Sequence, residues 1–172
     1  RKREQWMIFD MGGGTLDVCL VMVRDGHIVV PQDGHEGDNN LGGRKLDLEL
    51  FGRVLQKQCD QGYALDSFNE NSPKYRVPFS KLMLAVETAK IELSQDSQTV
   101  VHVEGVLCQD DRGRDVTVYV PITRQEYEQL IGPTVTSALY VCDTLMRKNR
   151  LSSRDIGKLV LVGGPTKTPF LK

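Results

Sequence analysis

The sequence contains no apolar run long enough to cross a membrane, and its acidic and basic residues nearly cancel. Lys and Arg number 22 and Asp and Glu number 23, which gives a formal net charge of -1 over 172 residues. This balance gives no reason to expect a nucleic-acid or membrane surface. The Tyr and Phe residues are too scattered for a base-stacking platform. No apolar segment follows the charged residues Arg1–Glu4, so a secretory signal is not expected there.

Paired cysteines, repeats and low-complexity tracts are also missing. The four cysteines are Cys19, Cys59, Cys108 and Cys142, and none forms a CxxC pair. Three of them lie in apolar strand or helix patterns, which predicts buried free thiols in a reducing, cytoplasmic setting. The three histidines are His27, His35 and His102. None has a partner at the spacing of a metal site or a catalytic triad, so each is expected to be structural or solvated.

What the sequence does contain is an alternation of short apolar runs and turn residues. Residues 6–9 and 16–23 are apolar and flank a triple glycine, and Asp25-Gly26 separates the second run from residues 27–30. Asp-Gly is a strong signal for a two-residue hairpin turn. Three consecutive strands are therefore predicted, followed by a Gly-, Asp- and Asn-rich loop that begins at Gln32.

The middle of the chain reads as two helices and a hairpin. Apolar residues recur at helical spacing over 46–59, and a second helix is expected to start near Pro78. Residues 97–105 and 114–122 alternate like strands, with DDRGRD as the turn between them.

The last third predicts a long helix and a final strand. Thr123 and Glu126 form a capping box that opens the helix. Gly132-Pro133 is expected to kink or break it, and helical spacing resumes from Val135. KLVLVGG then reads as a buried strand, with a helix start at PTKTP. A helix before a final strand indicates a parallel crossover.

These elements predict a mixed α/β fold with a small insertion. The early hairpins require an antiparallel component, and the final crossover adds a parallel strand. The predicted division is a core of residues 1–59 and 123–172 with an α+β insertion at 60–122.

Three stretches carry side chains or backbone suited to a ligand. In FDMGGGTLDV, Gly12, Gly13 and Gly14 lack Cβ atoms, so their amides can approach an anion closely. Thr15 adds a hydroxyl donor, and Asp10 at a strand end suits a hydrated Mg²⁺. A glycine-rich hairpin turn without any ligand is the alternative.

The second stretch is Gly163-Gly164, at the end of the last predicted strand. Ligands of α/β sheets prefer the carboxyl ends of strands, where a backbone without Cβ atoms allows close approach. The alternative is an ordinary turn from strand to helix.

The third stretch is VETAKIELS. On a helix, Glu87, Lys90 and Ser94 form one polar stripe beside an apolar face. Such a stripe suits a nucleoside, with polar ends on the ribose hydroxyls and aliphatic stems on the base. A Glu–Lys surface pair worth a few tenths of a kcal/mol is the alternative.

Taken together, FDMGGGTLDV, GDNNLGGRKLD, VETAKIELS and LVLVGGPTKTP resemble, in order and spacing, the ATPase domain of DnaK-type chaperones of the heat shock protein 70 family. That family lies within the actin-like ATPase superfamily. The resemblance implies an actin-like, ribonuclease H-like α/β core of about five strands with a small α+β subdomain inserted at the cleft tip.

The resemblance also implies ATP or ADP with Mg²⁺ as ligands. Gly12, Gly13 and Thr15, with Gly14 between them, would face the β- and γ-phosphates, and Asp10 the metal through water. The adenosine contacts would be Glu87, Lys90, Ser94, Gly163, Gly164 and Lys167. The side chain of Lys167 would lie along the adenine face, and LGGRKLD would approach the nucleotide from the other side of the cleft.

Four positions depart from the family pattern. Arg44 replaces an acidic residue, Pro165 a serine, Lys167 an arginine and Thr168 a larger apolar residue. Lysine keeps the charge of arginine but not its planar stacking surface. These departures predict a divergent member of the family.

The resemblance covers the second lobe of the two-lobed ATPase domain. The first lobe and the peptide-binding domain would be partners in the parent chain, together with a nucleotide-exchange factor and a co-chaperone. A lobe without its counterpart is not expected to hydrolyse ATP. Two alternatives stay open: a lobe of a small-molecule kinase of the same superfamily, and a non-enzymatic module that docks a partner.

Overall fold

The computed structural model describes residues 3–171 and folds as two compact units. The first unit runs from the start of the described chain to Lys45 and from Gly132 to its end; the second unit is Leu46–Ile131. The second unit contains the expected insertion at 60–122 and extends further at both ends. It takes in part of the first long helix because Phe51 on that helix packs on Phe68 and Phe79.

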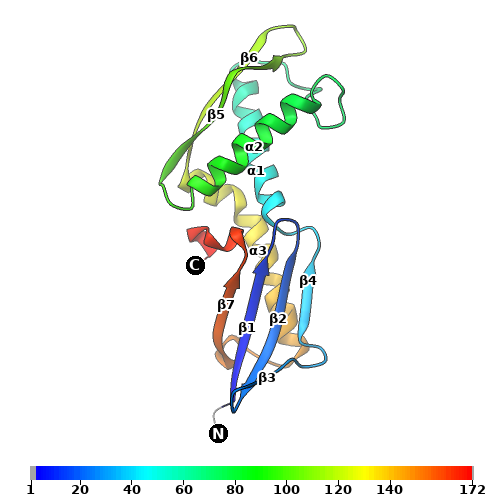
Figure 1. Ribbon diagram of the computed structural model, residues 1–172, viewed down its shortest axis with the longest axis vertical. Helices are drawn as coiled ribbons and strands as arrows, with labels where there is room; N and C mark the ends of the chain where they lie inside the picture. Colours follow the sequence, from blue (N-terminus) through cyan, green and yellow to red (C-terminus); the bar gives the residue numbers. More distant parts are fainter. Residues whose placement is uncertain (1–2, 172) are drawn as a thin grey trace. The chain divides into compact units, whose positions relative to one another are not determined.

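A five-stranded mixed sheet forms the centre of the first unit (Figure 1). Its strands are β1 (Arg3–Met11), β2 (Leu16–Arg24), β3 (His27–Val29), β4 (His35–Asp38) and β7 (Ile156–Val162). The order is β3-β2-β1-β7, and β4 also pairs with β2. β2 is antiparallel to β1, whereas β7 is parallel to it, as predicted.

The turn between β2 and β3 confirms the hairpin prediction. Asp25 and Gly26 have φ angles of 49° and 81°, the left-handed backbone that a two-residue primed turn requires. The loop prediction was wrong at β4, where His35–Asp38 pairs with β2. Backbone pairing does not require apolar side chains, and at Gly37 a Cβ would lie 2.9 Å from the Leu16 carbonyl oxygen.

Helix α3 (Arg124–Lys148) is continuous through Pro133, so of the predicted kink or break, the break was wrong. An interior proline costs about 3 kcal/mol because it removes a helical N–H and crowds the preceding turn. Ile131 and Thr134 beside it are buried, and burial on both sides offsets that cost. The Thr123 half of the predicted capping box is confirmed, because the Glu126 amide donates to the Thr123 hydroxyl (3.1 Å), whereas the Glu126 carboxylate accepts from Arg53 and Lys57.

The core of the first unit follows the strand alternation. Met7, Phe9 and Met11 on β1 point to the same side as Leu16, Val18 and Leu20 on β2, and all six are buried. Figure 1 shows α3 behind this sheet, and Asn149 just after the helix donates to the Asp33 carbonyl (2.9 Å).

The cysteine prediction was only partly right. All four are free, but only Cys142 on α3 is buried, and burial raises the pKa of its thiol to about 11. Cys19 and Cys108 are partly exposed and Cys59 is exposed. Cys19 alternates with the buried Val18 and Leu20, which places it on the other face of the sheet.

The second unit packs two helices with a hairpin. Its elements are α1 (Gly43–Asp60, from Leu46 on), α2 (Arg76–Glu92), β5 (Gln98–Gln109), β6 (Asp115–Thr123) and the start of α3. β5 and β6 are antiparallel, as predicted. Leu82, Val86 and Ala89 form the buried face of α2.

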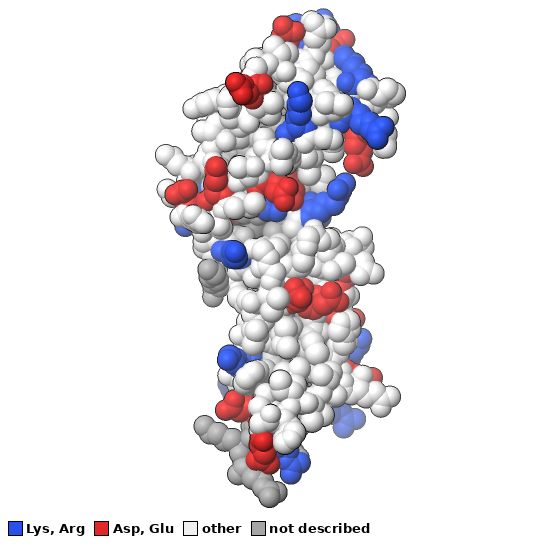
Figure 2. Space-filling view, viewed as in Figure 1, with Lys and Arg blue, Asp and Glu red and all other residues white. Residues whose placement is uncertain are grey.

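No helix within residues 3–171 combines the length and the apolar character needed to cross a membrane. On the face of each unit seen in Figure 2, acidic and basic side chains are interspersed.

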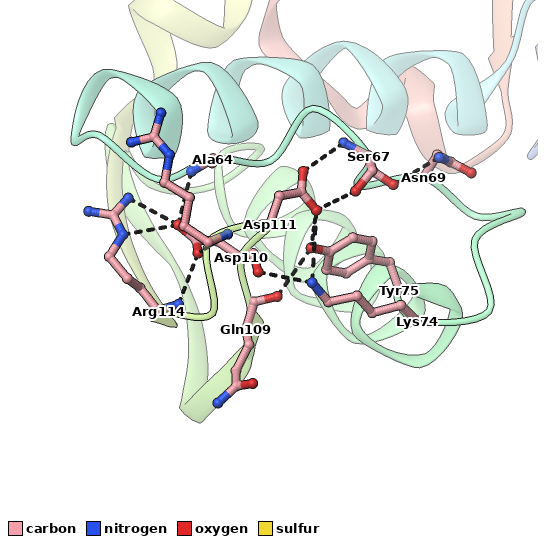
Figure 3. Close-up of polar contacts among 10 residues, drawn as sticks. Ala64, Ser67, Asn69, Lys74, Tyr75, Gln109, Asp110, Asp111 and Arg114 are labelled. Carbon is pink, nitrogen blue, oxygen red and sulfur yellow. Dashed lines mark hydrogen bonds and ion pairs between the residues drawn. The ribbon is translucent and has the colours of Figure 1, made fainter.

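A buried aspartate fixes the β5–β6 turn to the loop before α2 (Figure 3). Asp110 is fully buried and accepts hydrogen bonds from the amides of Ala64 (3.0 Å), Arg112 and Arg114 (both 2.9 Å). The guanidinium of Arg114 donates to it as well, through Nε (3.1 Å) and Nη2 (3.0 Å). The next residue, Asp111, accepts hydrogen bonds from Tyr75 (2.7 Å) and from the Ser67 hydroxyl.

Hydrogen bonding decides the ionisation of Asp110. Burial alone would raise the pKa of this carboxyl, but the amides of Ala64, Arg114 and Arg112 and the Arg114 guanidinium hold it well below its ordinary value. The carboxylate form therefore contributes stability above the unfolded pKa of about 3.9, and this contribution is lost as the pH falls below that value.

We predict that Asp110→Asn lowers the melting temperature by about 5 °C at neutral pH, because an amide cannot accept all five bonds. The exposed neighbour Asp115, which accepts only a 3.3 Å bond from Gln109, supplies the control Asp115→Asn, expected to change little. Thermal unfolding followed from pH 7 to pH 3 should show the Asp110→Asn deficit shrinking with acid. A deficit that grows with acid would contradict the assignment.

Candidate functional site

The triple glycine forms the turn between β1 and β2. The Gly12 amide donates to the Thr15 carbonyl (2.9 Å) and closes the turn. Gly13 and Gly14 are exposed, and within residues 3–171 their amides donate to no acceptor. Successive amides without acceptors make a concavity that can bind an anion.

The start of α1 lies against this turn. The amides of Gly43 and Arg44 donate to the carbonyls of Gly12 (2.9 Å) and Gly13 (2.6 Å). A Cβ at Gly42 would lie 2.7 Å from the carbonyl carbon of Gly14, so only glycine fits there. The positive end of the helix dipole therefore lies at the turn and favours an anion. Arg44 contributes its amide to this contact, while its side chain is exposed.

Two carboxylates flank the turn. Asp10 on β1 is paired with Asp17 on β2, so both side chains leave the same face of the sheet, and directly opposed Cβ atoms lie about 5 Å apart. Asp17 is a site residue that the sequence reasoning missed. Its signal was the symmetric placement of Asp10 and Asp17 about the glycine turn.

Asp17 also has two polar neighbours. The Thr15 hydroxyl donates to it (3.3 Å), and His35 Nε2 lies 3.3 Å from its other oxygen. His35 was expected to be structural or solvated, and the β2–β4 pairing places it beside Asp17. Within the described residues, no three His, Cys, Asp or Glu side chains are placed to hold a bare metal ion. Mg²⁺ prefers carboxylate oxygens and keeps several of its waters, so a hydrated ion suits two carboxylates on one face of the sheet.

Gly163 meets the same end of the sheet from β7. Its φ is 95°, and a Cβ there would lie 2.7 Å from the Met11 carbonyl carbon and 3.3 Å from a carboxylate oxygen of Asp10. Thr166 donates its hydroxyl to the Gly163 carbonyl (2.7 Å) and shapes the short 3₁₀ helix Gly164–Lys167. Asp10, the glycine turn and Gly163 thus converge, and Lys167 is exposed.

The residues of the predicted polar stripe belong to the second unit, with Glu87 and Lys90 on α2; the prediction that Ser94 lies on the same helix was wrong, because α2 ends at Glu92. Glu87 is exposed, and the Ser94 hydroxyl donates to the Ile91 carbonyl (2.6 Å). The Lys90 ammonium lies 2.7 Å from a carboxylate oxygen of Asp47 on α1. Sequence reasoning missed Asp47, although it ends the LGGRKLD motif.

A groove of about 460 Å³ lies between α2 and β5, also within the second unit. Leu84, Ala85 and Thr88 line its helix side and Val100, His102 and Val103 its strand side. Lys81, Glu92 and Glu104 add charges of both signs.

Comparison with known proteins places the chain in one family. The model of the family described as Hsp70 protein matches residues 1–172. Chaperone protein DnaK of Picrophilus torridus is 31% identical over 166 residues, covering 96% of this chain and 25% of that protein. Chaperone protein DnaK of Thermoplasma acidophilum is 30% identical over 175 residues, covering 99% of this chain and 26% of that protein. The chain thus spans about a quarter of the length of these relatives.

We predict that Gly163→Ala destabilises the protein by at least about 2 kcal/mol, because its backbone is left-handed and its Cβ would overlap the Met11 carbonyl. The adjacent Gly164→Ala is the matched control, since nothing lies within 4 Å of a Cβ there. Chemical denaturation of both variants measures the difference. Equal stabilities would show that the Gly163 backbone is not fixed by this contact.

Proposed function

The chain belongs to the Hsp70 family, and on that premise we propose that it is the second nucleotide-binding lobe of a DnaK-type, ATP-dependent chaperone. Family membership assigns it the α/β fold of actin-like ATPases, which agrees with its mixed sheet and helices. The small-molecule kinase alternative has no support from the relatives, which are chaperones.

The observation that carries the proposal is the glycine turn with its two acceptor-free amides. The amides of Gly13 and Gly14 would donate to β- and γ-phosphate oxygens, assisted by Gly12 and the Thr15 hydroxyl. The N-terminus of α1 adds its dipole. Asp10, with Asp17 opposite it, would hold a hydrated Mg²⁺ through water. Such an ion neutralises charge on transferring phosphates.

The adenosine end of the nucleotide would be bound by side chains. Glu87 and Lys90 of α2, with Ser94 just after the helix, would offer an acceptor, an ammonium and a hydroxyl for the ribose. Gly163 and Gly164 allow close backbone approach, and Lys167 would lie along the base. Because lysine lacks the planar surface of arginine, we expect weaker stacking at that position.

In the parent protein, ATP binding would close the two lobes and thereby control the release of a bound peptide. The first lobe would complete the catalytic site, so the isolated chain would bind nucleotide without hydrolysing it. We propose a cytoplasmic setting, with a nucleotide-exchange factor and a co-chaperone among the partners.

A second role, docking of the exchange factor, is favoured by the groove between α2 and β5. Leu84 in its wall is 66% exposed, so its apolar surface is available to a partner. Charges of both signs at its edge would orient the partner.

The nucleotide proposal predicts that the chain binds ADP with Mg²⁺ more weakly than about 1 µM, because a half-site buries less ligand than a closed cleft. Gly13→Val should weaken binding at least about tenfold, since nothing lies within 4 Å of a Cβ there and the side chain would fill the anion site. Calorimetric titration measures both affinities. Gly52→Ala on α1, equally open around its Cβ, is the control. Sub-micromolar affinity would contradict the half-site argument, and phosphate release above background would contradict the expected lack of hydrolysis. Undiminished binding by Gly13→Val would refute the phosphate role of the glycine turn.

The docking proposal predicts that Leu84→Lys weakens binding of a purified exchange factor of DnaK-type chaperones at least about tenfold. Val77→Lys is the control, because Val77 lies on the same helix, is 64% exposed and is outside the groove. Biolayer interferometry with both variants separates the two sites. Equal binding by the two variants would exclude the groove.

A further inference from the structure

The ion pair between Lys90 and Asp47 differs from an ordinary surface pair. Its two charged atoms are 2.7 Å apart, and the side chains are only 12% and 11% exposed. Exposed pairs contribute little to stability, and a buried pair must first offset the loss of hydration of both charges. A contribution to stability therefore does not account for the Lys90–Asp47 pair. Orientation of the Lys90 ammonium is a role that the pair can serve.

The Asp47 carboxylate faces one side of the Lys90 ammonium. An ammonium carries three N–H groups, and one carboxylate oxygen of Asp47 lies 2.7 Å from it on the α1 side. Lys90 lies in the last turn of α2, where the helix dipole favours a cation. A lysine side chain without a fixed partner samples many rotamers, and ordering them on binding costs affinity.

We propose that Asp47 is a positioning residue that holds the Lys90 ammonium in place, so that its remaining donors can bind the two ribose hydroxyls of an adenosine. This inference rests on the proposed adenosine role of Lys90. Glu87, one turn earlier and exposed, would accept hydrogen bonds from the same hydroxyls. A ribose with both hydroxyls would then be preferred over a deoxyribose.

A purely structural role for Asp47 makes different predictions. It would lower the affinity for every nucleoside alike, through loosening of the α1–α2 contact. It would also act whether or not residue 90 carries an ammonium. A positioning role acts only through Lys90 and changes the discrimination between ribose and deoxyribose.

The test measures binding of adenosine and 2′-deoxyadenosine to the chain and to Asp47→Asn, Lys90→Gln and the double variant, by ligand-observed NMR. Asp47→Asn should weaken adenosine binding about five- to tenfold and bring the adenosine to 2′-deoxyadenosine affinity ratio close to one. In the Lys90→Gln background, Asp47→Asn should have no further effect. Asp60→Asn, an exposed carboxylate on the same helix, is the control and should match the wild type.

Asp47→Glu is included in case Asp47→Asn fails to fold. It keeps the negative charge beside Lys90 but moves the carboxylate. It too should lose the discrimination, and a retained preference would overturn the inference. Equal loss for both nucleosides, or a further loss in the Lys90→Gln background, would also overturn it and leave the proposed function standing. Absence of adenosine binding by the wild-type chain would instead refute the proposed adenosine role, and the inference with it.

Discussion

The first unit depends on a backbone contact that no side chain could enter. The turn Gly12–Thr15 and the segment at Gly42 approach so closely that a single Cβ at Gly42 would lie within 2.8 Å of the Thr15 nitrogen. This contact places the amides of Gly43 and Arg44 on the carbonyls of the turn and starts α1 there. Those carbonyls are satisfied within the fold, whereas the exposed amides of Gly13 and Gly14 donate to no acceptor within residues 3–171.

The second unit differs in that charged side chains connect its segments. The connected segments form no sheet with each other. Asp110 collects the amides of its own turn and that of Ala64, far away in sequence. Glu126 at the start of α3 accepts from Arg53 (2.6 Å) and Lys57 (3.0 Å) on α1. Each carboxylate has several donors, which offsets the loss of its hydration.

Local signals in the sequence were sufficient for most elements, whereas partner residues depended on register and tertiary packing. The Asp25-Gly26 turn and the β5–β6 hairpin follow from residues adjacent in the chain. Strand β4 was missed because its residues are polar and glycine, and its backbone pairing with β2 needs no apolar pattern. Asp17 and Asp47 were missed because their significance lies in what stands opposite them: Asp10 across a strand pair, and Lys90 on another helix.

The departures from the family pattern bear unequally on the two ends of the proposed nucleotide site. At the phosphate end the donors are amides, and Arg44 contributes through its backbone, so replacing the usual acidic side chain leaves that contact intact. At the adenosine end the contacts proposed for Lys90 and Lys167 come from side chains, and substitution changes them directly. Pro165 adds a further loss there, since it has no N–H to donate. Divergence in this chain should therefore alter recognition of the nucleoside more than recognition of the phosphates, because amides supply the same donors whatever the residue.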